Sequence, residues 1–212
     1  VNDNKPYFKA IVLKAFHVIS FFSVSLLGLL YVISDDIIVI LLSEKWIPSV
    51  NFFKLLLISS FAYPIGALTN SVLASNGNSK AFLNLTIIRY SLLTPAYVLL
   101  YFYSIKVFLY SLIIINLISL IFYVKFLSKE INSSVMWFYK ALFPYVTINL
   151  LITIILSNFI DLIELDGLLR LIITSILYAV SNLCLFYFTR SEGLLLLVLE
   201  LKKIIKNKFI KL

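Results

Sequence analysis

Six long runs of apolar residues recur along this chain, and they constrain its fold more than any other feature. A helix needs about 20 predominantly apolar residues to cross the hydrocarbon core of a bilayer. The runs cover residues 11–33, 52–73, 81–103, 107–127, 137–156 and 168–188. Lipid offers the backbone no hydrogen-bonding partner and strand alternation is absent, so each run is predicted to be α-helical. The sequence therefore predicts an all-α, polytopic membrane helix bundle with about six transmembrane helices.

The composition excludes a soluble domain. Of the 212 residues, 62% are hydrophobic and 13% are charged, whereas soluble domains average about 45–50% apolar and about 25% charged residues. The net charge is +8, but the basic residues fall between the apolar runs, so they indicate topology and not nucleic-acid binding. The single cysteine, Cys184, lies inside an apolar run. We expect no internal disulfide, no metal site and no cofactor.

The polar stretch around residues 125–140 divides the chain into two parts. Residues 1–130 hold the first four spans, and residues 131–212 hold a trailing helix pair and a basic tail. Between the first two spans, residues 34–50 are predicted to form a short interfacial helix with Trp46 at headgroup level. The tail, residues 193–212, is predicted to lie on the membrane surface. Val1 is not an initiator methionine, so we expect the natural chain to begin further upstream.

Charged residues predict the orientation of the bundle. If the N-terminus is cytoplasmic, the cytoplasmic segments contain most of the basic residues, and the outer segments collect most of the acidic ones. The positive-inside rule favours this arrangement over its inverse. Both ends of the chain are therefore expected in the cytoplasm. The loops are short throughout, which leaves no room for a soluble catalytic domain.

Catalytic groups are scarce in the sequence. There is one histidine, His17, and no acidic residue lies within a predicted span. No Gly-rich phosphate loop, paired carboxylate or HExxH motif is present. Catalysis usually requires several titratable groups in one place, so the sequence does not favour an enzyme.

Arg89 is the most informative polar residue, because it lies well inside the third span. An arginine near mid-membrane costs at least about 2.5–3.5 kcal/mol on insertion scales and usually faces a cavity or a partner. A guanidinium in a cavity suits an anionic group such as a phosphate. Alternatively, a tilted helix would let Arg89 snorkel to the headgroups. Asn84 and Asn70 are candidates to join Arg89, or to tie helices together by hydrogen bonds.

Three prolines interrupt the spans and are candidate hinges. They are Pro64, Pro95 and Pro144. Proline frees a backbone carbonyl and kinks a helix, and kinked helices occur in proteins that change conformation as well as in static bundles.

Residues 37–80 resemble bacterial polysaccharide flippases of the multidrug/oligosaccharidyl-lipid/polysaccharide exporter superfamily. The resemblance rests on a Leu-Leu-x-Glu-Lys-Trp turn, with Glu44, Lys45 and Trp46, and on a following span that ends in Ala-Ser-Asn-Gly-Asn before a lysine. The family turn more often has glycine where this chain has Ser43. The resemblance extends over about residues 8–126, and the last two spans match only in being hydrophobic.

The resemblance implies one C-terminal lobe of a two-lobe transporter with 12–14 helices, whose N-terminal half is missing here. Such a protein moves an oligosaccharide linked to undecaprenyl pyrophosphate across the bacterial inner membrane by alternating access, for O-antigen or capsule synthesis. Its partners would be this lipid-linked substrate, membrane lipids and other polysaccharide assembly proteins. Family cavities are lined by basic residues, a role that would suit Arg89 and Lys14.

Two other functions fit a polytopic bundle. A membrane polymerase or acyltransferase acting on lipid-linked sugars would usually carry a larger outer loop or a His/Asp centre. A drug antiporter of the same superfamily would be expected to carry a membrane-embedded carboxylate. Neither feature is visible in this sequence.

Overall fold

The computed structural model describes residues 5–160 and 167–188, and within these ranges every regular element is a helix. Five elements are long α-helices: α1 (Lys5–Val32), α5 (Ser79–Phe102), α6 (Ile105–Glu130), α7 (Val135–Ile160) and α8 (Gly167–Phe188). The shorter elements are α2 (Ser34–Leu42), the 3-10 helix η1 (Glu44–Ser49), α3 (Val50–Ser59), the 3-10 helix η2 (Ser60–Ala62) and α4 (Tyr63–Ser75). The predicted all-α bundle is confirmed.

Six helical segments in the described ranges are long and apolar enough to cross a membrane. Five correspond to single helices, and the second, Glu44–Ser75, joins η1, α3, η2 and α4. Several helices extend beyond the predicted runs, because polar end residues continue the helix after the apolar run has ended. Of the short helix expected over residues 34–50, α2 forms only Ser34–Leu42, and Trp46 lies in η1 at the start of the second candidate span. The strained backbone at Ser43 separates the two. The predicted surface helix at residues 193–212 lies outside the described residues.

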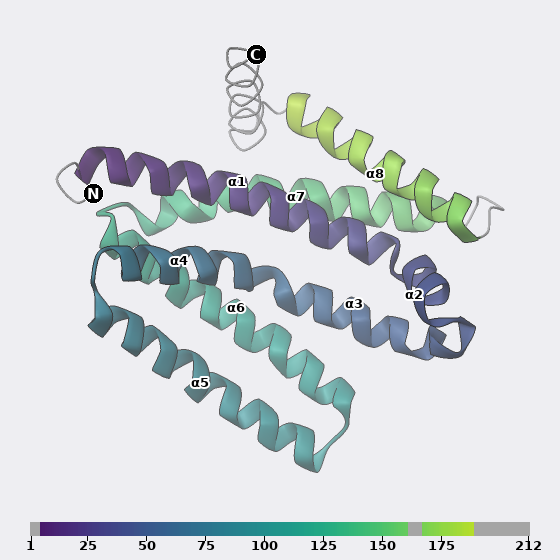
Figure 1. Cartoon of the computed structure of the whole chain (residues 1–212), viewed down its shortest axis with the longest axis horizontal. Helices are drawn as coiled ribbons and strands as arrows, with labels where there is room; N and C mark the ends of the chain where they lie inside the picture. Colours follow the sequence, from purple (N-terminus) through teal and green to yellow (C-terminus); the bar gives the residue numbers. More distant parts are fainter. Residues whose placement is uncertain (1–4, 161–166, 189–212) are drawn as a thin grey trace, which may run out of the picture.

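The helices lie roughly side by side in the view of Figure 1. α1 packs along α7, and α8 packs against both. The composite second span lies between α1 and α6, and α5 forms a hairpin with α6 at the edge of the bundle. One end of the bundle, called here the N-terminal end, holds the start of α1, the α4–α5 turn and the α6–α7 turn. The other end holds α2, η1 and the α5–α6 turn.

The second span is broken in its middle, and Pro64 explains the break. Proline has no N–H, so it cannot donate to the carbonyl of Ser60 four residues earlier. The N–H of Tyr63 bonds this carbonyl instead, which tightens residues 60–62 into a 3-10 turn. The hydroxyls of Ser59 and Ser60 both donate to the Leu56 carbonyl at 2.8 Å. The break therefore leaves these polar groups hydrogen-bonded, as a membrane interior requires.

A buried apolar cluster holds the break in place. Its residues come from α1, η2, α4, α5, α6 and α7, and Phe16, Tyr123 and Phe138 are the largest. Gly66 lets α4 approach α6, because a Cβ at this position would lie 2.8 Å from the Tyr123 ring. Close approach through glycine is a common way to pack transmembrane helices.

Buried hydrogen bonds join α1, α7 and α8. His17 Nδ1 and the Tyr145 hydroxyl are 2.8 Å apart, and the Ser25 hydroxyl donates to Asn182 Oδ1 at 3.2 Å. The Tyr178 hydroxyl donates to Asn149 Oδ1 at 2.9 Å. Such bonds hold helices together where lipid is as apolar as the side chains.

Gly28 makes room for the Tyr178 hydroxyl, so Gly28→Ala should destabilise the bundle. A Cβ on Gly28 would collide with this hydroxyl. We expect a loss of about 1–3 kcal/mol in the free energy of unfolding, the usual cost of overpacking. In a Tyr178→Phe background the same substitution should cost less, because the clashing oxygen is gone. Equal costs in both backgrounds, measured by unfolding in detergent micelles, would contradict this packing.

Candidate functional site: a half-buried arginine at the helix break

Arg89 packs against the break in the second span. Its guanidinium carbon lies 5.2 Å from the centroid of the Tyr63 ring, a cation–π contact. Tyr63 is the first residue of α4, directly after η2. A cation over an aromatic ring contributes about 0.5–1 kcal/mol at exposed sites and about 2 kcal/mol or more when water is excluded. The side chain of Arg89 is half-buried, so the free-energy contribution of this contact is expected to lie between these two values.

This contact holds the guanidinium midway along the spans. Arg89 follows Ser79, the first residue of α5, by about 15 Å at a rise of 1.5 Å per residue. Tyr63 precedes Ser75, the last residue of α4, by about 18 Å on the same measure. A snorkelling arginine would point back toward the nearer end of its helix. Arg89 instead packs on a ring in the middle of the neighbouring span.

The surroundings of Arg89 are aromatic and contain no carboxylate. Tyr123 on α6 lies near both Arg89 and Tyr63. Residues 63–102 include no aspartate or glutamate. In the described part of the chain Arg89 makes no ion pair and no hydrogen bond. The ring of Tyr63 thus stabilises the charge of Arg89, which remains available to an anion.

The other predicted candidates make no hydrogen bond or ion pair with Arg89 among the described residues. Asn84 is exposed on α5, and Lys14 is exposed on α1. Asn70 is half-buried on α4, two turns after Tyr63, and its Oδ1 is buried without a hydrogen-bonding partner. Within the described ranges no hydrogen bond or ion pair joins any two of the four candidates. Tyr63 is the contact that sequence reasoning missed, because no local pattern predicts which ring meets a distant arginine.

The Arg89–Tyr63 contact predicts different effects for two substitutions. Tyr63→Phe keeps a ring under the guanidinium and should preserve stability in detergent. Tyr63→Leu removes the ring and should lower the free energy of unfolding by about 0.5–2 kcal/mol. An Arg89→Gln background should abolish the difference between Phe and Leu. The same difference with and without the arginine would show that the ring contributes only packing.

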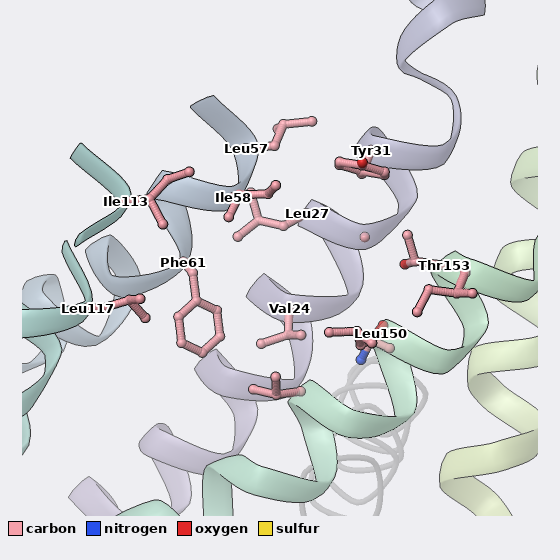
Figure 2. Close-up of a pocket in the computed structure, with 14 residues that line it drawn as sticks. Val24, Leu27, Tyr31, Leu57, Ile58, Phe61, Ile113, Leu117, Leu150 and Thr153 are labelled. Atoms are coloured by element: carbon pink, nitrogen blue, oxygen red, sulfur yellow. The ribbon is translucent and has the colours of Figure 1, made fainter. Parts of the chain in front are cut away.

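An apolar cavity of about 540 Å³ reaches the same helix break. Figure 2 shows Phe61 of η2 pointing into it, with Leu117 of α6 and Val24 of α1 beside it. The cavity lies between α1, α3, η2, α6 and α7 and is lined by Val24, Leu27, Gly28, Tyr31, Leu57, Ile58, Phe61, Ile113, Leu117, Val146, Asn149, Leu150, Thr153 and Ile154. Its lining is almost entirely hydrocarbon, so it suits an alkyl or isoprenoid chain and not a charged group.

The turn with Glu44, Lys45 and Trp46 forms the exposed 3-10 helix η1. Ser43, just before it, has φ +81° and ψ 167°. This backbone region is essentially restricted to glycine and costs other residues about 1–3 kcal/mol. The geometry gives a physical reason for the glycine that the flippase resemblance leads one to expect at this position.

Ser43→Gly should therefore stabilise the protein by about 1 kcal/mol or more through relief of this strain. The matched control is Ser49→Gly, because Ser49 has ordinary helical angles of φ −79° and ψ −16°. The control should give no gain. Thermal unfolding in detergent measures both variants, and no gain for Ser43→Gly would show that the turn is unstrained.

The Asn-Gly-Asn turn has a structural role at the N-terminal end. The amides of Asn76 and Asn78 donate to the two carboxylate oxygens of Glu130 at 2.9 and 2.7 Å. The Asn78 side chain also caps α5 by accepting from the N–H of Ala81. Gly77 has φ +69°, which glycine adopts without strain. The turn thus fastens α4 and α5 to the end of α6, and the partner Glu130 could not be found from spacing.

The three prolines occupy different settings. Pro64 lies at the break, whereas Pro95 and Pro144 lie inside the continuous helices α5 and α7. Their role as hinges stays a prediction.

In the described residues no group of three His, Cys, Asp or Glu side chains is placed to hold a metal ion.

Comparison of this chain with protein-family models, with curated proteins and with solved structures finds no match.

Proposed function

We propose that this chain is part of a membrane transporter that moves a lipid-linked oligosaccharide across the bacterial inner membrane for surface polysaccharide synthesis. The substrate class is an oligosaccharide on undecaprenyl pyrophosphate, carried by alternating access and without bond chemistry. Membrane lipids and other polysaccharide assembly proteins would be its partners. The flippase resemblance of residues 37–80 and the geometry around Arg89 support this proposal.

The observation that carries the proposal is the unpaired Arg89 in mid-span. A pyrophosphate headgroup cannot cross hydrocarbon alone, because burying an unpaired anion is very costly. A guanidinium can bind two phosphate oxygens at once. Tyr63 orients Arg89, and no carboxylate of residues 63–102 competes for it. Such a cation is therefore suited to receive an anionic headgroup partway across the membrane.

The apolar cavity supports an amphipathic substrate. It reaches Phe61, two residues before Tyr63 in the chain. The hydrocarbon part of a lipid-linked substrate would be stabilised there by burial, while its phosphates require the cation. The broken second span lies between the two environments, as discontinuous helices do at the substrate sites of many transporters.

The distribution of charge supports cytoplasmic ends. In the described ranges, the N-terminal end of the bundle carries Glu130 as its single acidic residue and the basic residues Lys5, Lys9, Lys14, Lys80, Lys125, Lys129 and Lys140. The opposite end carries three acidic residues, of which Asp35 pairs with Lys54 at 2.6 Å and Asp36 with Arg170 at 3.6 Å. The positive-inside rule then orients the N-terminal end toward the cytoplasm.

Arg89→Ala and Arg89→Lys in the full-length protein test this function. We expect alanine to reduce surface polysaccharide by about tenfold or more, the effect of losing a charge-assisted phosphate contact worth about 1.5–3 kcal/mol. Lysine should retain part of the export because it keeps the charge but not the bidentate geometry. The measurement is surface polysaccharide in cells, normalised to the amount of protein in the membrane.

Arg170→Ala is the matched control, because Arg170 is the other described arginine and lies at the end of a span against Asp36. It should leave export near the level of the unaltered protein. Normal export by both Arg89 variants at normal abundance would remove the main support for the proposal.

A further inference from the structure

The apolar cavity opens sideways, between α6 and α7. These helices are joined by a short turn at the N-terminal end of the bundle and diverge from it toward the other end (Figure 1). Leu117 on α6 and Leu150 and Ile154 on α7 line the cavity, yet they are 53%, 53% and 51% exposed. In the interior of a bilayer such side chains face lipid, because water is absent there. The cavity is therefore accessible to a lipid chain from the side of the bundle.

The walls of the cavity favour hydrocarbon over water. Asn149 has the most polar of the lining side chains, and it is already bonded to the Tyr145 carbonyl and the Tyr178 hydroxyl. Apolar cavities stay dry, because water inside them lacks polar partners. An empty volume of this size would deprive the lining side chains of van der Waals contacts on one side. A hydrocarbon ligand is thus favoured over both water and empty space.

The volume of the cavity selects the kind of chain. A methylene group occupies roughly the volume that a water molecule takes in the liquid, about 30 Å³. A cavity of about 540 Å³ therefore holds a chain of about 18 methylene groups. This is the length of an ordinary phospholipid acyl chain. An undecaprenyl tail consists of eleven isoprene units of five carbons each and is about three times too large, so only part of it would fit.

A lysine lies at the end of the cavity that points away from the N-terminal end of the bundle. Figure 2 shows Tyr31, near the end of α1, and Leu57 of α3 at this end of the cavity. Lys54 Nζ lies 5.6 Å from the centroid of the Tyr31 ring and donates to Asp35 Oδ2 at 2.6 Å. Because an ammonium has three N–H donors, Lys54 can donate to a phosphate oxygen as well.

The cavity is separate from the surroundings of Arg89. Ile113 and Leu117 of α6 line the cavity, but no residue of α4 or α5 does. Arg89 lies on α5 and packs on Tyr63 of α4. The cavity can therefore bind a ligand that does not contact Arg89.

We propose that the cavity binds one acyl chain of a membrane phospholipid, which enters between α6 and α7 and places its phosphate at Lys54. With the N-terminal end of the bundle toward the cytoplasm, this phospholipid belongs to the outer leaflet. The site goes beyond the proposed function, because a bilayer lipid binds there whatever the protein transports. The tail of a lipid-linked substrate would have to displace this lipid in order to use the cavity.

Filling the cavity with a larger side chain tests the site. Native mass spectrometry of the full-length protein, released from membranes in a mild detergent, counts the phospholipids that it retains. Leu117→Trp and Leu150→Trp fill the cavity. The matched controls are Ile114→Trp and Leu151→Trp, because these residues are 59% and 56% exposed on the same two helices but do not line the cavity. We expect each cavity variant to retain about tenfold less phospholipid than its control, because fewer methylene groups of the chain can be buried.

Added lipids test the length of the chain and the phosphate contact. Delipidated protein is titrated with lysophosphatidylglycerols of increasing acyl length. Retention should rise up to about 18 carbons and then level off, because the cavity is then full. Lys54→Gln should lower the preference for lysophosphatidylglycerol over lysophosphatidylcholine about fivefold, the effect of one lysine near an anionic lipid. Lys45→Gln, at an exposed lysine of the same end, should leave this preference unchanged.

Two results would overturn the proposal. Equal retention by the cavity variants and their controls would place the lipid on the outer surface of the bundle. Undecaprenyl phosphate retained in place of phospholipid, and lost in the cavity variants, would assign the cavity to the substrate tail instead. Thermal unfolding in detergent identifies any variant that fails to fold, and two cavity positions on different helices guard against one such failure. Arg89→Ala should keep the phospholipid, so loss of export and loss of this lipid can be told apart.

Discussion

The need to hydrogen-bond every backbone group inside the chain governs this structure, because a bilayer interior supplies no partners. It makes every regular element among the described residues a helix, and it also explains how the second span tolerates a break. Pro64 removes a donor, the Tyr63 N–H moves to the Ser60 carbonyl, and the hydroxyls of Ser59 and Ser60 bond the Leu56 carbonyl. Because these groups remain hydrogen-bonded, the irregular turn costs little free energy inside the bundle. The turn also places Tyr63 where its ring contacts Arg89.

The packing of the bundle follows from the same solvent. Lipid gives little hydrophobic drive for one apolar helix to associate with another, so close approach and buried hydrogen bonds become more important. Gly66 allows α4 to reach the ring of Tyr123, and Gly28 accommodates the hydroxyl of Tyr178. Bonds such as that between Tyr178 and Asn149 join α7 to α8. These contacts are few and directional, and they set which helix faces which neighbour.

Two sets of polar residues in the middle of the spans have different consequences. Those between α1, α7 and α8, such as His17 and Asn149, are buried and bonded to other helices, so they stabilise the bundle. Those on α4 and α5, such as Arg89 and Ser91, remain available for other partners. The proposed transport requires both a rigid set of helices and a surface whose polar groups are satisfied by water or substrate. This division makes the α4–α5 hairpin the part of the molecule to examine for transport.

The sequence by itself determined the fold class, the six spans and the short helix between the first two. Each depends on apolar run length, which a one-dimensional pattern records completely. It also singled out Arg89, because a charge within an apolar run stands out without any structure. It could not identify Tyr63, Tyr123 or Glu130 as partners, since they come from other helices and no spacing relates them to Arg89 or Asn76. Tertiary structure decided these pairings, because helix packing sets which face of each span is covered. For the same reason it also decided that the most polar span is the least buried.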